Sequence, residues 1–291
     1  MQVNKCTEIQ QCPICSGTSL DVIFTYNSPP EGEVSFAFSN DSSYYREYLQ
    51  CHACNHLVST YKMDLTSLYQ GDYVASNYKD MDGIRSSFKR IISLDPNESD
   101  NILRTFRISN FLKKRYRDVY EGRTLLDVGS GLGVFPYAMK QAGWDCTALD
   151  PDHNAVSHLE KFVGVRAVQG DFLTVPDLDT FDVITFNKVL EHVENPIEML
   201  KISRQYLKPG GFVYIELPDA EVAAYDGPDR EEFFVDHLHV FSFLSVTILA
   251  QKSGLMPVLI ERLREPSTKY TLYAFLVSAS GNGNHGLGEV L

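Results

Sequence analysis

Two pairs of cysteines near the start of the chain have a spacing that is typical of metal sites. Cys12 and Cys15 form one Cys-x-x-Cys pair, and Cys51 and Cys54 form a second. Four thiolates in a tetrahedral array make a closed zinc site, which stabilises a fold and leaves no open position for a substrate. We therefore predict a structural zinc ion bound by these four side chains.

The second pair begins 36 positions after Cys15, so the zinc ribbon must contain an inserted hairpin. Residues 24–26 and 34–38 could supply its strands. A redox dithiol and ordinary apolar packing are the alternatives to zinc, and His52 or His56 could replace one thiol.

A glycine-rich segment is the clearest candidate for a ligand-binding loop. Residues 126–134 read Leu-Asp-Val-Gly-Ser-Gly-Leu-Gly-Val, between an expected strand and an expected helix. Glycines at alternate positions let the backbone turn tightly and approach a ligand. The spacing differs from the G-x-G-x-x-G dinucleotide fingerprint, and an aspartate beside the loop would repel a pyrophosphate but attract an ammonium group. A ligand with a cationic amine is favoured, with contacts from Asp127, Gly129, Ser130, Gly131 and Gly133.

Polar residues end the strands that follow this loop. Asp150 lies 23 positions after Asp127, where a carboxylate can accept hydrogen bonds from both hydroxyls of a ribose. Asp171 could accept a hydrogen bond from an adenine amino group with Phe172 packed near the ring, and Asn187 ends the fourth strand. Each aspartate could instead merely cap a helix. Their occurrence at successive strand ends favours a nucleoside-binding edge.

Histidines and carboxylates on later loops could activate a second substrate. Glu191 and His192 follow the fourth strand, residues 216–219 carry two more carboxylates, and Asp236 and His237 precede an expected helix. A histidine with a carboxylate partner is a typical base and orienter. We predict His237 as the base, Asp236 as its orienter and His192 as the second catalytic candidate, although His192 could instead cap a helix or touch the ligand.

Alternating strands and helices must position these residues. Between residues 124 and 217 they alternate at roughly 20–25 residues per unit, which is typical of a parallel α/β sheet. The last two strands are expected to form an antiparallel edge. The expected strands cover residues 124–128, 145–150, 165–168, 181–186, 212–217, 257–262 and 270–278. The expected helices cover residues 100–120, 134–142, 154–162, 196–207 and 242–253.

The composition describes a globular chain. Its 291 residues are 44% hydrophobic and 22% charged, which allows a sizeable core and excludes general disorder. A net charge of −12 does not favour nucleic acid or an anionic membrane as a partner. The longest apolar-rich stretch covers residues 240–250, whereas a membrane span needs about 20 residues. The first residues lack the apolar centre of a signal peptide, so we expect a cytoplasmic protein without a membrane span.

Charge and pattern change together along the chain. The net charge is −4 over residues 1–60, +3 over residues 61–120 and −11 over residues 121–291. These changes predict a zinc ribbon over residues 1–62, a helical connector or lid over 63–120, a ligand-binding domain over 121–280 and a flexible tail over 281–291.

With these motifs together, the sequence resembles the class I S-adenosylmethionine-dependent methyltransferases over residues 100–280. The resemblance rests on the loop at 127–133, Asp150, Gly170-Asp171, Asn187 to His192 and Lys208-Pro-Gly-Gly211. It implies an α/β fold with a seven-stranded, doubly wound, Rossmann-like sheet and S-adenosylmethionine as cofactor. It also implies Asp127 and the glycine loop at the methionine end, Asp150 on the ribose and Asp171 at the adenine.

A four-cysteine ribbon before such a domain is similar to the sugar methyltransferases of deoxysugar and surface-polysaccharide pathways. The sugar C-methyltransferases among them carry Tyr-x-Glu-His where this chain has Phe234-Val-Asp-His237, and they have a further C-terminal domain. These departures disfavour C-methylation and favour O-methylation of a sugar, a nucleotide-sugar or a similar small molecule, with C- or N-methylation of a sugar as the alternative. Ubiquinone-type O-methyltransferases are similar around Glu191-His192 but have glutamate in place of Lys188, so their metal site is not implied.

Three other functions remain alternatives. A nucleic-acid methyltransferase with the ribbon as reader is favoured by a basic run but disfavoured by the acidic net charge. A non-catalytic binding protein could keep the glycine loop, and a dehydrogenase is disfavoured by the glycine spacing. The basic run could also be a solvated helix face, or could contact a nucleotide-sugar pyrophosphate. It consists of Arg104, Arg107, Lys113, Lys114, Arg115 and Arg117.

Overall fold

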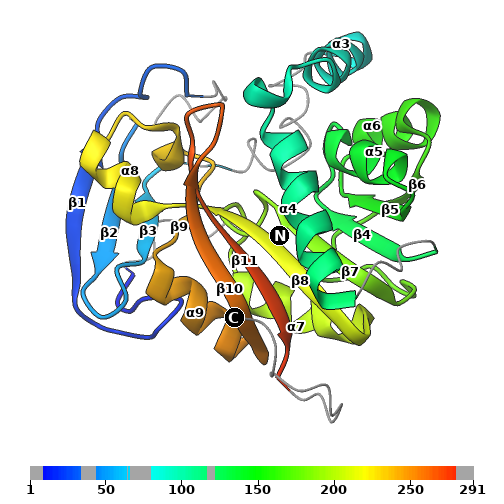
Figure 1. Cartoon of the computed structure of the whole chain (residues 1–291). Helices are drawn as coiled ribbons and strands as arrows, with labels where there is room; N and C mark the ends of the chain where they lie inside the picture. Colours follow the sequence, from blue (N-terminus) through cyan, green and yellow to red (C-terminus); the bar gives the residue numbers. More distant parts are fainter. Residues whose placement is uncertain (1–8, 34–43, 64, 66–79, 117–121, 280–291) are drawn as a thin grey trace.

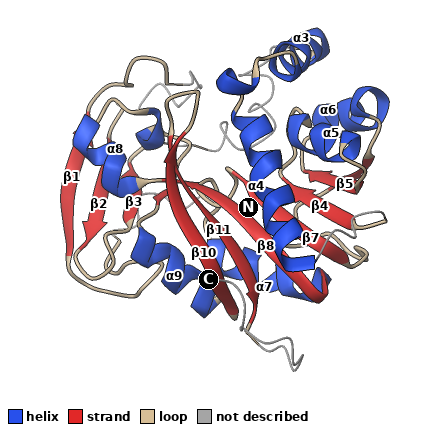
Figure 2. Cartoon of the chain, in the orientation of Figure 1, coloured by secondary structure: helices blue, strands red, loops and turns tan. Residues whose placement is uncertain are grey.

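Two β-sheets form the framework of the molecule (Figures 1 and 2). The computed structural model describes residues 9–33, 44–63, 65, 80–116 and 122–279. The strands are β1 (Leu20–Tyr26), β2 (Arg46–Cys51), β3 (Leu57–Tyr61), β4 (Thr124–Val128), β5 (Asp145–Asp150), β6 (Arg166–Gln169), β7 (Phe181–Asn187), β8 (Leu207–Pro218), β9 (His239–Val240), β10 (Leu255–Arg264) and β11 (Tyr270–Ser278). The α-helices are α3 (Met81–Ile92), α4 (Asp100–Tyr116), α5 (Val134–Gln141), α6 (His153–His158), α7 (Pro196–Ser203), α8 (Ala220–Asp226) and α9 (Phe243–Lys252).

The larger sheet has seven strands within the described residues, in the order β10-β11-β8-β7-β4-β5-β6. The strands from β4 to β8 pair in parallel, whereas β11 runs antiparallel to both β8 and β10. The seven-stranded α/β sheet and its antiparallel edge are therefore confirmed. Strand directions of this kind place the ends of β4, β5 and β7 along one edge, where ligands bind in such sheets.

Helices cover both faces of this sheet, because neighbouring residues in a strand point to opposite sides. Leu125 packs in one buried cluster with α4 and α5, while Leu126 packs in the other with α7 and α9. Val183 and Ile184 of β7 divide between the two clusters in the same way. The continuous apolar runs of the sequence thus become a sheet buried on both faces.

The smaller sheet joins the amino-terminal strands to residues 239–240. In the part of the chain that the structure describes, its order is β1-β2-β3-β9, all antiparallel. The two residues of β9 pair with β3, at Leu57 with Val240 and at Val58 with His239. The strand expected near residues 24–26 lies in β1, whereas the one expected at 34–38 and the tail at 281–291 lie outside the described residues.

Several element boundaries differ from the prediction. The helix expected over 196–207 is α-helical only to Ser203, and β8 begins at Leu207 rather than at residue 212. The register with β7 shifts between Phe181 and Val183, so the Pro-Gly-Gly segment is a bulge within the strand. The helix expected over 154–162 is α6 followed by a π-helical turn that ends at Gly164. No described helix is long and apolar enough to cross a membrane.

Candidate active site

The glycine loop joins β4 to α5 at the edge where the parallel strands end. Gly129, Gly131 and Gly133 have φ angles of 70°, 48° and 70°, which residues with side chains rarely adopt. A Cβ on Gly129 would lie 2.7 Å from Val189, and one on Gly133 would lie 2.5 Å from Leu159. A Cβ on Gly131 would meet nothing within 4 Å. The outer glycines are required for packing, and the middle one leaves the loop open to a ligand.

Asp127 is held rigidly at the base of this loop. Its Oδ1 accepts hydrogen bonds from the Thr185 hydroxyl at 2.7 Å and from the Asn187 amide at 2.8 Å, and the Ser130 hydroxyl donates to its backbone carbonyl at 2.9 Å. Burial raises the pKa of this carboxyl group to about 6. Asn187 therefore contacts Asp127 directly, a role that its place at a strand end could not reveal.

Asp150 ties the glycine loop to the end of β5. Its Oδ2 accepts from the backbone N–H of Gly131 at 2.7 Å, and its Oδ1 accepts from that of Asp152 at 2.9 Å. Burial raises the pKa of this carboxyl group as well. The fold thus brings together the two carboxylates and the loop that the sequence predicted as neighbours.

Asp171 and Phe172, the residues predicted at the adenine, lie at the surface and in the core, respectively. Asp171 is exposed after β6, and its Oδ1 accepts from the backbone N–H of Leu173 at 2.9 Å. Phe172 is 2% exposed and packs against Phe186 and Tyr206, with ring centroids 5.6 and 5.9 Å away. Phe172 is a core residue here, because apolar packing takes up its ring. Contacts of Asp171 and Phe172 with an adenine stay predictions.

A cavity of about 300 Å³ lies beside the end of β7. Its wall combines the loop after β7 with residues 231–237, and Gly32, Pro218 and Lys269 complete it. We call it the acceptor cavity. His192, Asp236 and His237, the predicted catalytic residues, all line it, although 44 positions of sequence separate the first two.

The two histidines of the acceptor cavity have defined tautomers. Nδ1 of His237 lies 2.9 Å from the carbonyl oxygen of Glu232, and Nδ1 of His192 lies 2.8 Å from that of Asp236. A carbonyl only accepts, so each Nδ1 carries a proton, and Nε2 of His237 keeps a lone pair when that ring is neutral. Burial lowers the pKa of His237, which keeps it neutral. The acceptor at Nδ1 of His237 is the Glu232 carbonyl, and a carboxylate oxygen of Asp236, the predicted orienter, lies 3.8 Å from His192. An orienting role of Asp236 stays a prediction.

Glu191 is the functional candidate whose environment the sequence did not reveal. It is fully buried, and neither carboxylate oxygen has a hydrogen-bond partner among the described residues. Its ligand atoms and those of His192 and His237 all lie within 4.8 Å of one another. The setting of Lys188 was not predicted either: it has a left-handed φ of 59° and donates to the Thr271 hydroxyl at 2.6 Å. The sequence named both residues but gave no signal of their burial or partners.

Two of the basic residues of α4 form buried ion pairs. Arg104 and Arg107 each lie 2.5 Å from a different carboxylate oxygen of Glu216 in β8, and the Tyr214 hydroxyl donates to Glu216 at 2.6 Å. Although burial opposes it, the two arginines hold the pKa of Glu216 well below its usual range. The two arginines therefore do not point to a pyrophosphate, and Glu216 is not free to act on an acceptor.

Comparison with known proteins assigns the central part of the chain. Residues 96–259, more than half of the chain, match the family model described as a methyltransferase domain. The chain belongs to this family. The methyltransferase domain includes the glycine loop, Asp150 and most of the acceptor cavity.

Sequence relatives and a solved structure agree with this assignment. The chain is 35% identical over 106 residues to a cypemycin N-terminal methyltransferase from a Streptomyces species, covering 34% of this chain and 43% of that protein. It is 33% identical over 106 residues to a ubiquinone biosynthesis O-methyltransferase from Caulobacter vibrioides, covering 34% and 42%. The chain thus spans less than half of the length of these two relatives. The fold resembles magnesium protoporphyrin IX methyltransferase from Synechocystis PCC 6803, with a TM-score of 0.54, 12% identity, and 72% and 98% of the two chains covered.

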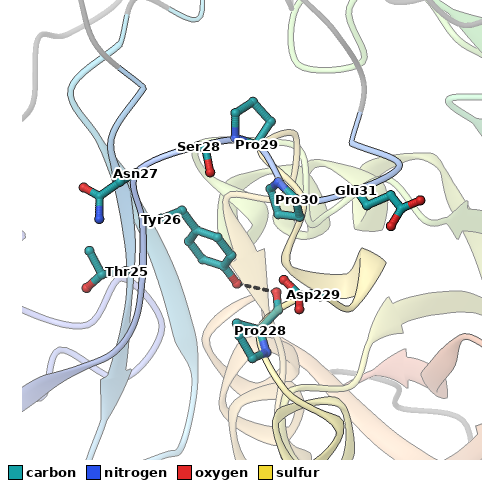
Figure 3. Close-up of a pocket in the computed structure, with 9 residues that line it drawn as sticks. All are labelled: Thr25, Tyr26, Asn27, Ser28, Pro29, Pro30, Glu31, Pro228 and Asp229. Atoms are coloured by element: carbon teal, nitrogen blue, oxygen red, sulfur yellow. Dashed lines mark hydrogen bonds between the residues drawn. The ribbon is translucent and has the colours of Figure 1, made fainter.

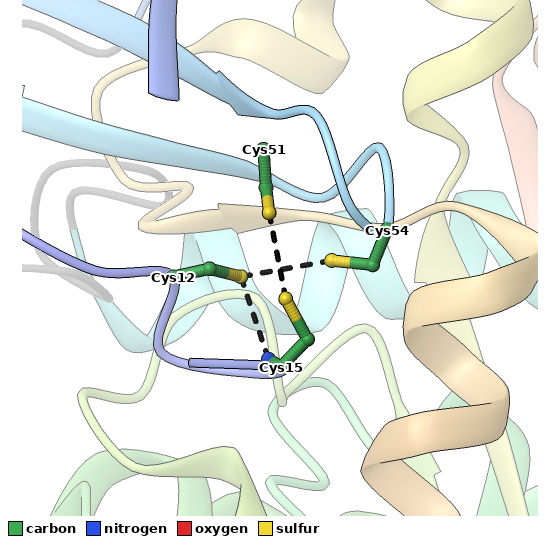
Figure 4. Close-up of side chains that lie close together, drawn as sticks. All are labelled: Cys12, Cys15, Cys51 and Cys54. Atoms are coloured by element: carbon green, nitrogen blue, oxygen red, sulfur yellow. Dashed lines mark hydrogen bonds between the residues drawn. The ribbon is translucent and has the colours of Figure 1, made fainter. Parts of the chain in front are cut away.

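The four paired cysteines converge beside the methyltransferase domain (Figure 4). The sulfur atoms of Cys12 and Cys54 are 3.6 Å apart, those of Cys15 and Cys51 are 3.4 Å apart, and all four lie within 4.8 Å of one another. A hydrogen bond with the Cys54 thiol lowers the pKa of Cys12 to about 5. Backbone N–H of Gly17 donates to the sulfur of Cys15 at 3.3 Å. Four converging sulfurs fit the donor set of a closed zinc site.

The nearby histidines have other partners. His52 is exposed and pairs with Asp21 at 2.7 Å, while Nε2 of His56 lies 3.1 Å from Nδ1 of His239 in the core. Neither residue is needed in place of a thiol. His239 is buried as well.

A second cavity, of about 600 Å³, opens at the end of β1 (Figure 3). Residues 25–31 line one side and Pro228 and Asp229 the other, and the Tyr26 hydroxyl donates to the Pro228 carbonyl at 2.7 Å. It is larger than the acceptor cavity. Its lining has neither histidine nor cysteine and does not include the glycine loop, so it is a poor candidate for the site of chemistry.

Proposed function

We propose that this protein is an S-adenosylmethionine-dependent methyltransferase that acts on a small molecule. The observation that carries the proposal is the arrangement of two sites along one edge of the sheet. The glycine loop with Asp127 and Asp150 forms one, and the acceptor cavity with the imidazoles of His192 and His237 forms the other. Membership of the methyltransferase-domain family supports the assignment of these sites to cofactor and acceptor.

The cofactor-binding residues act as follows in this proposal. Asp127 and the loop of Gly129, Ser130, Gly131 and Gly133 bind the methionine end, because a buried carboxylate attracts an ammonium group. Asp150 accepts hydrogen bonds from the ribose hydroxyls. Asn187 holds Asp127 in place. Asp171 binds at the adenine and Phe172 supports this end of the site from the core.

The acceptor cavity supplies the base. S-adenosylmethionine, when bound, supplies the methyl group on a sulfonium centre. Nε2 of His237 accepts the proton of an acceptor hydroxyl, and the carbonyl of Glu232 keeps the proton of Nδ1 in place. The negative charge of Asp236 stabilises the imidazolium that forms. His192 lies beside it, with a ring centroid distance of 4.9 Å, and binds the acceptor.

The acceptor that we propose is a hydroxyl of a sugar or nucleotide-sugar. The polar wall and modest volume of the cavity suit a small polyhydroxylated molecule. The combination of a four-cysteine cluster with this domain supports the same class. Because Arg104 and Arg107 pair with Glu216, they do not support recognition of a diphosphate, and the sugar is the part of the acceptor that the cavity would bind.

Calorimetry and a turnover screen test this function. We expect S-adenosylhomocysteine to bind the purified protein, and nucleotide-sugars or free sugars to gain one methyl group in the presence of S-adenosylmethionine. Absence of binding to a folded protein would contradict the methyltransferase proposal. Methylation of amines alone would retain the enzyme class but overturn the base-assisted O-methylation.

We also propose that the four cysteines bind one structural zinc ion per chain. The ion would hold the turn at Cys12 and Cys15 against the turn at Cys51 and Cys54, so its binding energy would be folding energy of the smaller sheet. Cys51→Ala should lose the zinc, as measured by metal analysis of protein purified without chelators. Cys146→Ala, a buried cysteine outside the cluster, is the control and should retain it. A wild-type protein that contains no zinc would overturn the proposal.

A further inference from the structure

Residues 231–237, which we call the acceptor segment, form one wall of the acceptor cavity but have little regular structure. Apart from one 3₁₀ turn at Glu231–Phe233, the segment contains neither helix nor strand. Its internal hydrogen bonds are local, such as that from the backbone N–H of His237 to the carbonyl of Phe234 at 3.0 Å. A site on a loop needs support from other parts of the chain to hold its side chains in place. The position of the His237 imidazole therefore depends on what the segment contacts.

The hydroxyl group of Tyr48 reaches this segment from strand β2. Tyr48 is fully buried, and its hydroxyl donates to the backbone carbonyl of His237 at 2.7 Å, with that of Phe234 at 3.2 Å. Burial raises the pKa of Tyr48 well above its usual value, so the hydroxyl stays protonated and acts as a donor. The Tyr48 ring packs edge-on against Phe233, with the ring centroids 5.4 Å apart. A side chain of the smaller sheet, 189 positions earlier in the sequence, thus holds the backbone of the proposed base.

Glu33 supplies a second anchor from the same side. Its Oε2 accepts from the backbone N–H of Val235 at 2.7 Å and from Nη2 of Arg46 at 2.8 Å. Its Oε1 accepts from the Tyr44 hydroxyl at 2.5 Å. The side chains of Glu33 and Arg46 are both 0% exposed, and the guanidinium group lies over the Tyr26 ring, 3.8 Å from its centroid. The carboxylate that holds the acceptor segment is thus itself held on several sides.

This buried ion pair has a geometric effect. Such a pair is weak evidence for stability, because the cost of removing two charges from water offsets much of their attraction. Arg46 instead fixes the carboxylate of Glu33, and this carboxylate fixes the amide of Val235, two residues before His237. Together with the Tyr48 hydroxyl, it holds the segment on both sides of the peptide units that carry the imidazole.

Two further bonds hold this segment from the larger sheet and from the loop after β7. The backbone N–H of Tyr270 donates to the side chain of Glu232 at 2.6 Å, which fixes the beginning of the segment. Nδ1 of His192 donates to the carbonyl of Asp236 at 2.8 Å. Neither bond involves the backbone groups that are held from the smaller sheet. The two sets of anchors therefore do not duplicate each other.

We propose that Tyr48 and Glu33 are positioning residues for His237. Held in this way, the imidazole keeps Nδ1 on the Glu232 carbonyl and leaves Nε2 for the acceptor. If the segment moved, Nδ1 would lose this carbonyl and the ring could take its other neutral tautomer, in which Nε2 carries the proton and cannot accept one. The benefit for methyl transfer rests on the proposed function, whereas the fixed orientation of the ring does not. The smaller sheet thereby completes the acceptor site.

Histidine NMR on the full chain tests this proposal without an acceptor. In protein whose histidines are labelled with ¹⁵N, two-bond ¹H–¹⁵N spectra distinguish the two neutral tautomers, and His237→Ala identifies the signals of this ring. At neutral pH the wild type should show the Nδ1–H tautomer, and Tyr48→Phe should show a measurable population of the Nε2–H tautomer.

Turnover provides a second measurement once the screen has identified an acceptor. The kcat of Tyr48→Phe should fall about 10-fold, because small displacements of a reacting group reduce rates by up to about 10²-fold. Its affinity for S-adenosylhomocysteine should stay within about 2-fold of the wild type, since the glycine loop lies elsewhere.

Tyr26→Phe is the matched control for Tyr48→Phe. It also removes a phenol hydroxyl of the smaller sheet, but this hydroxyl donates to the carbonyl of Pro228 at 2.7 Å, outside the acceptor segment. Tyr26→Phe should therefore keep the wild-type tautomer of His237 and the wild-type kcat. Equal changes in the two variants would show a general loosening of the smaller sheet and would overturn the proposal, as would unchanged His237 signals in Tyr48→Phe.

Glu33→Ala and Glu33→Gln form a second pair, which decides alone if Tyr48→Phe does not fold. Both lose the charge that pairs with Arg46, but the amide oxygen of glutamine can still accept from the N–H of Val235. Glu33→Gln should therefore keep more of the wild-type tautomer than Glu33→Ala, and identical spectra would contradict the positioning role. Binding of S-adenosylhomocysteine to the same samples verifies folding. Its absence from a folded wild type would refute the proposed function and leave the tautomer comparison valid.

Discussion

The carboxylates of the cofactor edge, which comprises the glycine loop, Asp127 and Asp150, have different surroundings from those of the acceptor cavity. At the cofactor edge, Asp127 and Asp150 each accept two hydrogen bonds from the protein itself. In the cavity, both oxygens of Glu191 lack such donors among the described residues. The first arrangement fixes groups in place before a ligand arrives, and the second leaves binding capacity for whatever enters. A common cofactor and a particular acceptor would call for this division.

The largest expected effect concerns the cavity. His237→Ala should lower kcat by about 10²–10⁴-fold, the usual contribution of a group that manages the proton of a reacting hydroxyl. Affinity for S-adenosylhomocysteine should stay within about 2-fold, because the glycine loop lies elsewhere. Steady-state kinetics and calorimetry measure the two quantities.

His153→Ala provides the control for this change, since His153 lies on α6 and contacts Gln169 outside the cavity. It should retain full turnover. If His237→Ala also retains full turnover, the cavity is not the site of chemistry and the comparison between the two regions fails. Loss of turnover in His192→Ala alone would move the base to the loop after β7.

An intermediate effect is expected at the cofactor edge. Asp150→Ala removes a charged acceptor, and a hydrogen bond of that kind contributes about 1.5–3 kcal/mol. The affinity for S-adenosylmethionine should therefore fall by about 10- to 150-fold, as measured by calorimetry. Turnover at saturating cofactor should change much less than in His237→Ala. Unchanged affinity in a folded variant would refute the assignment of Asp150 to the ribose.

The smallest effect concerns stability rather than binding. Burial raises the pKa of Asp127 to about 6, so the folded state favours the protonated form. The stability that the protonated carboxyl group of Asp127 contributes is fully present below the unfolded pKa of about 3.9. It is lost as the pH rises through about 6. Asp127→Asn stays neutral and can still accept from Thr185 and Asn187 through its amide oxygen.

At pH 7 this variant should be more stable than the wild type by about 1–3 kcal/mol, and the gain should vanish near pH 4. Urea unfolding at both pH values measures the difference. The same variant should bind S-adenosylmethionine more weakly, because it lacks the charge that attracts an ammonium group. A variant that is destabilised at pH 7 would show that the negative charge of Asp127 is stabilising.

Local patterns predicted what depends on neighbours in sequence. The strand at 124–128, the glycine loop and the paired cysteines follow from spacing within a few residues, because backbone conformation and turn geometry are local. The sequence also predicted that the ends of β4, β5 and β7 lie close together, because parallel strands end at the same edge of a sheet. These are the parts that the structure reproduces.

Distant partners were not predictable in the same way. The pairing of Arg104 with Glu216 joins residues 112 positions apart, and nothing in either segment identifies the other. The orientation of His237 depends on a backbone carbonyl, which every residue possesses. Among the described residues no donor reaches the carboxylate oxygens of Glu191, and the lack of such a partner leaves no mark in a sequence. The start of β8 was misplaced because a bulge and a turn share the same Pro-Gly-Gly composition.

The two-residue strand β9 bears on how proteins of this kind can be recombined. It lies a few residues after His237 and pairs with β3, so the segment that lines the acceptor cavity also completes the smaller sheet. A chimera that exchanges residues 1–62 with those of a relative would place foreign side chains against Val240 and His239. The amino-terminal sheet and residues 231–241 should therefore be inherited, and engineered, as one cassette.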